Sequence, residues 1–90
     1  MYSKTTVVSN PSGLHARPAA VFAKQASAYE SKVTIANVTK GGAAGDAKSM
    51  LAIMMLAAKP GDEVEISAEG ADEVAAVDEL VGLIEIGCGE

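Results

Sequence analysis

The sequence has little of the chemistry that most catalytic and metal-binding sites use. Its 90 residues include one cysteine, one histidine, no tryptophan and three aromatic residues in all. A single cysteine excludes an intrachain disulfide, and one histidine with one cysteine cannot supply a set of metal ligands. We interpret Cys88, in the C-terminal tail 87–90, as incidental rather than as a redox or tethering thiol. No metal or other cofactor is expected.

The chain also lacks a basic surplus and a long hydrophobic run. Twelve acidic residues against seven basic ones give a net charge of −5, which argues against a nucleic-acid partner. No apolar run approaches the ~20 residues that span a bilayer, and the N-terminus has no apolar signal segment. We therefore expect no membrane insertion and a cytoplasmic location. The length of the chain predicts one domain over residues 1–90, with a small core of aliphatic side chains.

The pattern of apolar residues predicts an α+β domain. Strands are expected at 4–9, 32–38 and 63–68, with a short or irregular strand near 41–46, a glycine-rich segment that we interpret as a flexible connection. Helices are expected from 16 to about 28, over 49–58, and from 70–73 onward. The expected buried positions are Ala19, Phe22, Ala23 and Ala26 in the first helix, Val64, Ile66 and Ala68 in the last strand, and Val74, Val77, Leu80, Val81 and Ile84 in the last helix. This order favours helices packed on one face of an antiparallel sheet.

The one histidine lies where an extended segment gives way to a helix. Residues 10–13 are turn formers, and Pro18 suits the first turn of a helix. The first N–H groups of that helix form an anion site, and their positive field keeps the His15 imidazole neutral and nucleophilic. Arg17 adds a guanidinium that suits phosphate oxygens. The residues thus indicate a phosphoryl-accepting histidine, although a lone histidine in such a position is more often structural.

Residues 49–58 are apolar on every side of the predicted helix. A domain this small cannot bury all of them, so some of Met50, Leu51 and Met54 should form an exposed patch, with Ile53 or Met55 in the core. Ser49 could cap this helix, and Asp46 competes for the same role. On the first helix Lys24 and Gln25 should be exposed. Lys24 is either a contact for an acidic partner or part of a solvated face.

Three blocks of the sequence resemble one known family. Gly13–Ala19 is similar to the active-site signature of HPr, the histidine-containing phosphocarrier of the bacterial phosphoenolpyruvate-dependent sugar phosphotransferase system. Lys48–Leu51 and Ile66–Glu73 resemble that family's regulatory-serine segment and its last strand-to-helix junction. The resemblance covers nearly the whole chain in the right order. It implies the HPr fold, an open-faced β-sandwich of four antiparallel strands with three helices on one face, in the order β-α-β-β-α-β-α.

The resemblance also implies a function and a set of site residues. A stoichiometric carrier, rather than an enzyme, would accept a phosphoryl group at Nδ1 of His15 from phosphorylated enzyme I and pass it to the EIIA domains of sugar permeases. Arg17 would be the second catalytic residue. The residues that stabilise the phosphoryl group would be Ser12, Ala16 and Pro18. Partner proteins would dock on Ala20, Lys24, Met50, Leu51 and Met54.

Several alternatives stay open. The resemblance implies regulatory phosphorylation of Ser49, with an HPr kinase/phosphorylase and a catabolite-control transcription factor as further partners, whereas the residues alone are equally consistent with a plain helix cap. The alternative function is that of an HPr-like regulatory module, or of a carrier in a nitrogen-related or dihydroxyacetone branch of the phosphotransferase system. We expect a monomer. The chain departs from the family pattern by three additional residues before Lys48, which leaves the loop 41–46 undetermined.

Overall fold

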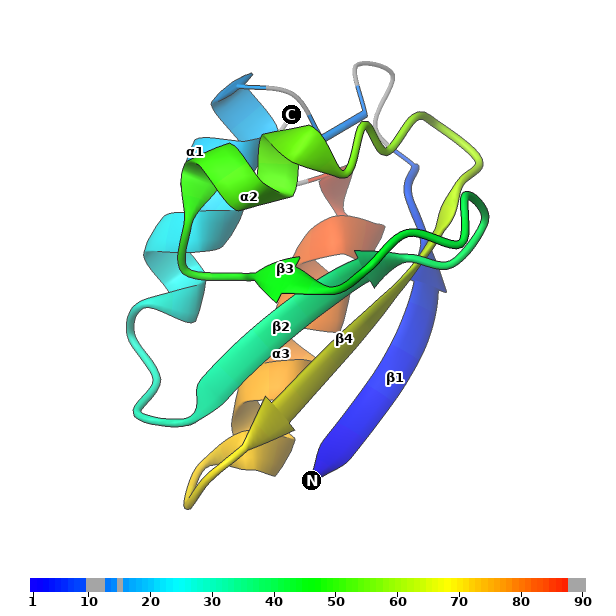
Figure 1. The fold of residues 1–90 in the computed structure, drawn as a ribbon. Helices are drawn as coiled ribbons and strands as arrows, with labels where there is room; N and C mark the ends of the chain where they lie inside the picture. The colour runs from blue at the N-terminus through cyan, green and yellow to red at the C-terminus, as the bar shows by residue number, and fades with distance from the viewer. Residues whose placement is uncertain (10–12, 15, 88–90) are drawn as a thin grey trace.

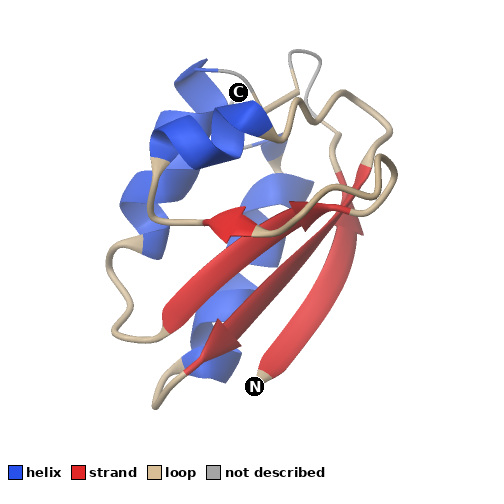
Figure 2. Ribbon diagram, in the orientation of Figure 1, coloured by secondary structure: helices blue, strands red, loops and turns tan. Residues whose placement is uncertain are grey.

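A single antiparallel sheet carries three helices on one face, as Figures 1 and 2 show. The computed structural model describes residues 1–9, 13–14 and 16–87. Within these residues the elements follow the predicted order: β1 (Tyr2–Val7), α1 (Ala16–Ala26), β2 (Lys32–Asn37), β3 (Gly45–Asp46), α2 (Met50–Met55), β4 (Glu63–Glu69) and α3 (Glu73–Glu85). The α+β class and the open-faced sandwich are confirmed.

The sheet has the strand order β1-β4-β2-β3. Strand β4 lies between β1 and β2, so Ile66 stands opposite Lys4 on one side and Ile35 on the other. Burial alternates along β4, where Val64, Ile66 and Ala68 are buried and face the helices. The opposite face of the sheet carries no helix of the described chain (Figure 2). Strand β3 is only two residues long because the segment before it is rich in glycine and alanine, which form strands poorly.

The core is built around Phe22, the one phenylalanine, and otherwise from aliphatic side chains of all the larger elements. The predicted buried positions of α1 and β4 are confirmed. One position of α3 is wrong: Val74 is 52% exposed and Ala76 is buried instead. The buried face of α3 runs through Ala76 and Leu80, and a residue two positions from Ala76 lies on the opposite side of a helix.

The element boundaries differ from the predicted ones at several ends. Strand β1 begins at Tyr2 and ends at Val7, because its six residues pair with β4 from Ala68 back to Glu63. Helix α1 ends at Ala26, two residues early. The largest difference is α2, which ends at Met55 instead of 58. Ala57 there adopts a left-handed conformation, with φ 52°, which no helix can continue through.

The connection after β2 is more ordered than the expected flexible segment. Backbone hydrogen bonds run from Gly41 N to Val38 O (3.1 Å) and from Gly42 N to Asn37 O (3.3 Å). The Asn37 side chain also accepts a hydrogen bond from Lys40 N. The first half of the glycine-rich segment is therefore a compact turn built on the end of β2.

Asp72, just before α3, holds the loop between α1 and β2 in place. Its carboxylate accepts hydrogen bonds from the Ser31 hydroxyl and from the backbone N–H groups of Glu30 and Ser31. The Ser31 hydroxyl, followed by the Glu30 amide, lowers the pKa of Asp72 from its usual 3.8. Two other aspartates have a lowered pKa: the Lys59 backbone amide and the Asn37 side chain act on Asp62, and the Lys4 ammonium and the Tyr2 hydroxyl act on Asp78.

These aspartates predict a loss of stability in acid. Because the folded-state pKa of each lies below the unfolded value of 3.8, each ionised carboxylate stabilises the fold above that pH. The contribution disappears as the pH falls through the lower, folded-state values. Urea unfolding should therefore show a lower free energy of unfolding at about pH 3 than at about pH 5. In D72N the difference between the two pH values should shrink, and an unchanged difference would show that Asp72 contributes nothing to it.

Candidate functional site

The two residues before position 15 are anchored by the loop between α2 and β4. Gly13 and Leu14 are buried, and Leu14 N donates a hydrogen bond to Ala58 O (3.0 Å). Gly13 has φ +66° and lies so close to this loop that a Cβ atom there would stand 2.4 Å from Ala58 O. Ser12 and His15, the predicted phosphate contact and phosphoryl acceptor, lie outside the described residues.

Helix α1 begins at Ala16, immediately after His15, as the sequence predicts. Ala16 and Arg17 are exposed, and Pro18, in the first turn, is buried. The first N–H groups of a helix lack intrahelical acceptors and carry the positive end of the helix dipole. The first turn contains no acidic residue that would compete for them. This end of α1 can therefore hold an anion such as a phosphoryl group, with the guanidinium of Arg17 on the same turn.

Helix α2 exposes most of its side chains. Exposed fractions are 41% for Met50, 69% for Leu51, 37% for Met54 and 77% for Met55, whereas Ile53 is fully buried. The expected exposure of the first three is confirmed. Of the two candidates for the core, Ile53 is right and Met55 is wrong, because residues two positions apart lie on opposite sides of a helix.

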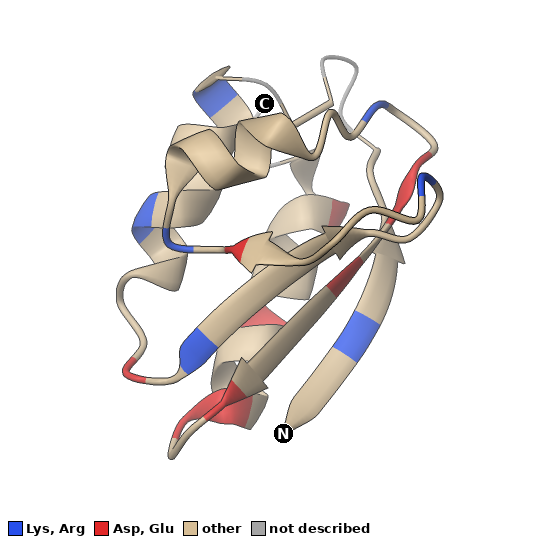
Figure 3. Cartoon of the chain, viewed as in Figure 1, with Lys and Arg blue, Asp and Glu red and all other residues tan. Residues whose placement is uncertain are grey.

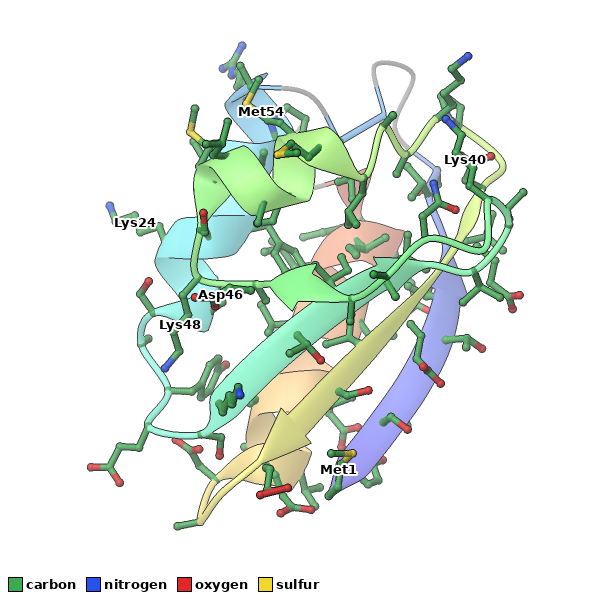
Figure 4. All side chains as sticks on the ribbon, in the orientation of Figure 1. Met1, Lys24, Lys40, Asp46, Lys48 and Met54 are labelled. Carbon is green, nitrogen blue, oxygen red and sulfur yellow. The ribbon has the colours of Figure 1, made fainter. Side chains whose placement is uncertain are left out.

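Helix α1 packs against α2 and adds exposed residues beside it. Ala20, Val21 and Lys24 are exposed, and with Arg17 they follow the spacing of one helix face. We call the exposed residues of the two helices the α1–α2 face: Arg17, Ala20, Val21, Lys24, Met50, Leu51, Met54 and Met55. Figure 4 shows Met54 near the beginning of α1 and Lys24 further along that helix. Sequence reasoning missed Val21, which stands one turn after Arg17 and could have been found by that spacing.

Charge is divided unequally between the helices. Helix α1 carries Arg17 and Lys24 and no acidic residue, and α2 carries no charge at all. Helix α3 has four acidic residues and no basic one. In Figure 3 the charged segments of α1 are blue and those of α3 are red, whereas the strands carry both colours. An acidic protein thus presents a locally positive, apolar surface on α1 and α2, which favours acidic partners.

Ser49 is the N-cap of α2. Its backbone is extended (φ −106°, ψ 114°), and its hydroxyl accepts a hydrogen bond from Ala52 N (3.2 Å). Asp46, the other candidate, instead accepts a hydrogen bond from Lys48 N (2.9 Å). Lys48 in turn donates from Nζ to Tyr29 O (2.8 Å) and ties this turn to the loop after α1. The cap is therefore Ser49, beside the exposed Met50 and Leu51.

The described part of the chain contains neither a candidate metal site nor a membrane-spanning helix. No group of three His, Cys, Asp or Glu residues there could hold a metal ion. No helix among the described residues is long and apolar enough to cross a membrane. Asp78 and Glu79 of α3 accept hydrogen bonds from the hydroxyls of Tyr2 and Tyr29, as fits a structural role at the surface.

Comparison with known proteins agrees with this arrangement. The family model described as "PTS HPr component phosphorylation site" matches residues 2–85. The phosphocarrier protein HPr of Haemophilus influenzae is 46% identical over 84 residues, which cover 93% of this chain and 95% of that protein. HPr of Vibrio cholerae is 40% identical over 85 residues and covers 94% and 96%.

Solved structures give the same result. The crystal structure of HPr-C-His from Thermoanaerobacter tengcongensis has a TM-score of 0.91 and 42% identity, covering 100% of this chain and 98% of that one. HPr from Bacillus anthracis has a TM-score of 0.83 and 34% identity, covering 90% and 93%. The fold, the helix start after His15 and these similarities lead to one conclusion: the chain belongs to the HPr family, the phosphocarrier proteins of the phosphotransferase system.

Proposed function

We propose that His15 accepts a phosphoryl group from phosphorylated enzyme I, charged by phosphoenolpyruvate, and passes it to EIIA domains of sugar permeases. A neutral imidazole can attack phosphorus and leave again with little rearrangement. The phosphorus bond to the donor histidine of enzyme I breaks as the bond to His15 forms, and the reverse exchange delivers the group to EIIA. Arg17 and the amides of Ala16 and Arg17 stabilise the charge on the phosphoryl oxygens, with Ser12 as a lesser contact and Pro18 holding the first turn in shape.

The observation that carries this proposal is the beginning of α1 at Ala16, with the exposed Arg17 on the same turn. It supports the role of His15 because a helix N-terminus and a guanidinium together stabilise a phosphoryl group attached to the preceding residue. A carrier also needs an exposed docking surface and no substrate pocket, which fits the α1–α2 face.

Incubation with enzyme I and labelled phosphoenolpyruvate tests the proposal. The protein should take up one equivalent of label, and the label should be released by mild acid and survive alkali, as a phosphoramidate does. Acid-stable label, or no label, would count against a phosphohistidine. Omitting enzyme I is the control and should leave the protein unlabelled.

We further propose that partners dock on the α1–α2 face, with Ala20, Met50, Leu51 and Met54 as apolar contacts and Lys24 as an electrostatic one. The Leu51→Gln variant should fold normally, because this side chain is 69% exposed and glutamine suits a helix. The KM for this protein in phosphorylation by enzyme I should rise roughly tenfold, the effect of losing one apolar anchor.

The matched control for Leu51→Gln is Val74→Gln, which makes the same kind of change at a 52% exposed position of α3. Its KM should equal that of the wild type. Equal KM values for both variants and the wild type would show that α2 is not the docking surface.

Ser49 suggests a second, regulatory function. As the N-cap of α2 it lies where a phosphate is favoured by the helix dipole and where it would add charge beside Met50 and Leu51. A serine kinase of the HPr kinase/phosphorylase type would then weaken docking or redirect the protein to a catabolite-control transcription factor. Acid-stable label that appears with such a kinase and is absent from Ser49→Ala would establish this role.

The remaining parts of the proposal concern the oligomeric state, the location and the partners of the protein. We propose a monomeric carrier of the cytoplasm that uses no cofactor, binds no nucleic acid and is not inserted in a membrane. The alternative, a regulatory module or a carrier in a nitrogen-related or dihydroxyacetone branch, differs in the partner that removes the label. Offering the labelled protein EIIA domains of each branch separately distinguishes them.

A further inference from the structure

Asn37, the last residue of β2, has a buried polar side chain that forms hydrogen bonds with three other residues. It is 1% exposed. Its Nδ2 donates to Leu56 O (3.2 Å) and to Asp62 Oδ2 (3.1 Å), and its Oδ1 accepts from Lys40 N (3.2 Å). A buried amide with its donors and acceptor satisfied fixes the segments it joins, since losing any one bond leaves a buried group unpaired.

Two of these partners lie at the ends of the segment 56–62, which connects α2 to β4. The Asp62 carboxylate also accepts a hydrogen bond from Lys59 N (3.1 Å), so it shapes the turn within this segment. Lys40, from the enlarged turn after β2, donates from Nζ to Ala57 O (2.8 Å). Figure 4 shows Lys40 at this corner of the molecule. The segment is thus held at Leu56 and Asp62 by the end of β2, and at Ala57 by the turn that follows β2.

The same segment is hydrogen-bonded to the chain at Val8 and at Leu14, which lie before and after residues 9–13. Val8 N donates to Asp62 O and Gly61 N donates to Val8 O, each at 2.9 Å. At the other side Leu14 N donates to Ala58 O (3.0 Å), and Gly13 is packed against that carbonyl. Val8 precedes the signature and Leu14 precedes His15 directly. The backbone that leads into and out of residues 9–13 is therefore attached to a loop that Asn37 holds.

We propose that Asn37 is a positioning residue for phosphoryl transfer, which acts by fixing the loop 56–62 to which Val8 and Leu14 are bonded. The inference rests on the proposed role of His15. In-line transfer between two proteins requires the accepting nitrogen to be placed closely, and a misplacement of about 1 Å can cost ~100-fold in rate. Asn37 acts through the loop, by its bonds to Leu56 and Asp62.

The Asn37→Asp variant changes this network with little change in volume. The introduced carboxylate has no N–H to donate to Leu56 O, and it faces the carboxylate of Asp62. We expect the rate of phosphorylation by enzyme I to fall roughly 10- to 100-fold. Amide hydrogen exchange at Leu14 and Val8 should become faster in the same variant.

The double variant Asn37→Asp with Asp62→Asn exchanges the two groups and serves as the rescue. Asp62 Oδ2 accepts hydrogen bonds from both Asn37 Nδ2 and Lys59 N, so the introduced amide can donate to the introduced carboxylate only by losing the bond from Lys59 N, and the bond to Leu56 O is not restored. Because the repulsion between two carboxylates is removed, part of the lost rate and of the exchange protection should return. Ser31→Ala is the control for a general loss of stability. Like Asn37, Ser31 is a buried polar residue, but it lies just before the first residue of β2, where its hydroxyl donates a hydrogen bond to Asp72. It should lower the free energy of unfolding without changing the rate.

The outcomes separate the inference from the function on which it rests. Slow transfer in Asn37→Asp, partial recovery in the double variant and a normal rate in Ser31→Ala support the inference. A wild-type rate in Asn37→Asp, or an equal loss of rate in Ser31→Ala, overturns the positioning role while the proposed function stands. A wild-type protein that takes no label from enzyme I overturns both.

Discussion

His15→Ala is expected to retain no label from enzyme I and phosphoenolpyruvate, whereas the wild type takes up one equivalent. The reason is the absence of any other acceptor of the same kind: His15 is the one histidine of the sequence. The helix start and Arg17 can stabilise a phosphoryl group but cannot form a bond to it. The measurement is bound radioactivity after gel filtration, compared with circular dichroism of the same sample to show that the variant is folded.

Two variants make the His15→Ala result specific. Ser49→Ala keeps the imidazole and should label fully, with a modest loss of stability of about 1 kcal/mol from the missing cap. Arg17→Lys keeps the charge but loses the planar, bidentate guanidinium, so it should label more slowly and reach the same final amount. Full labelling of His15→Ala would refute the assignment of the acceptor.

Gly13→Ala is expected to be strongly destabilising. At φ +66° any Cβ is strained, and here the atom would also stand 2.4 Å from Ala58 O. Because that contact is with backbone, relief requires the loop 56–62 to move, and the hydrogen bond from Leu14 N to Ala58 O must lengthen. We expect a loss of about 3 kcal/mol in the free energy of unfolding, the sum of a strained conformation and an overpacked contact.

The matched control is Gly41→Ala in the turn after β2. Gly41 has nearly the same φ of +67°, but a Cβ there would have nothing within 4 Å. It should cost only about 1 kcal/mol, from conformation alone. Urea unfolding of both variants checks the difference. If the two costs were equal, the contact between Gly13 and Ala58 would have no energetic consequence.

The features that the sequence predicts well are those with a strong local cause. Burial along β4 follows the two-residue period of a strand. The buried residues Ala19, Phe22 and Ala26 follow the three- and four-residue spacing of a helix. The beginning of α1 was predicted because turn formers and Pro18 mark it. The exposure of residues on α2 was predicted because a short helix that is apolar on all sides cannot be buried completely in a small domain.

The features that the sequence did not predict depend on distant partners. Helix α2 ends at Met55, three residues before the predicted end, because the chain reaches a left-handed Ala57, a conformation that alanine rarely adopts. Asn37 looks like an ordinary polar residue at a strand end, and only its contacts with Leu56 and Asp62 reveal its role. The order of the turn 38–42 likewise depends on the Asn37 side chain, together with the backbone hydrogen bonds of Gly41 and Gly42.

Onward transfer is the most direct test of a carrier. Labelled protein, freed of enzyme I and phosphoenolpyruvate, is mixed with an excess of an EIIA domain and sampled over time. The proposed function predicts that the label leaves this chain and appears on the EIIA domain in equal amount, with little inorganic phosphate formed. Label that stays on this chain, or that is released only as inorganic phosphate, would contradict the carrier function.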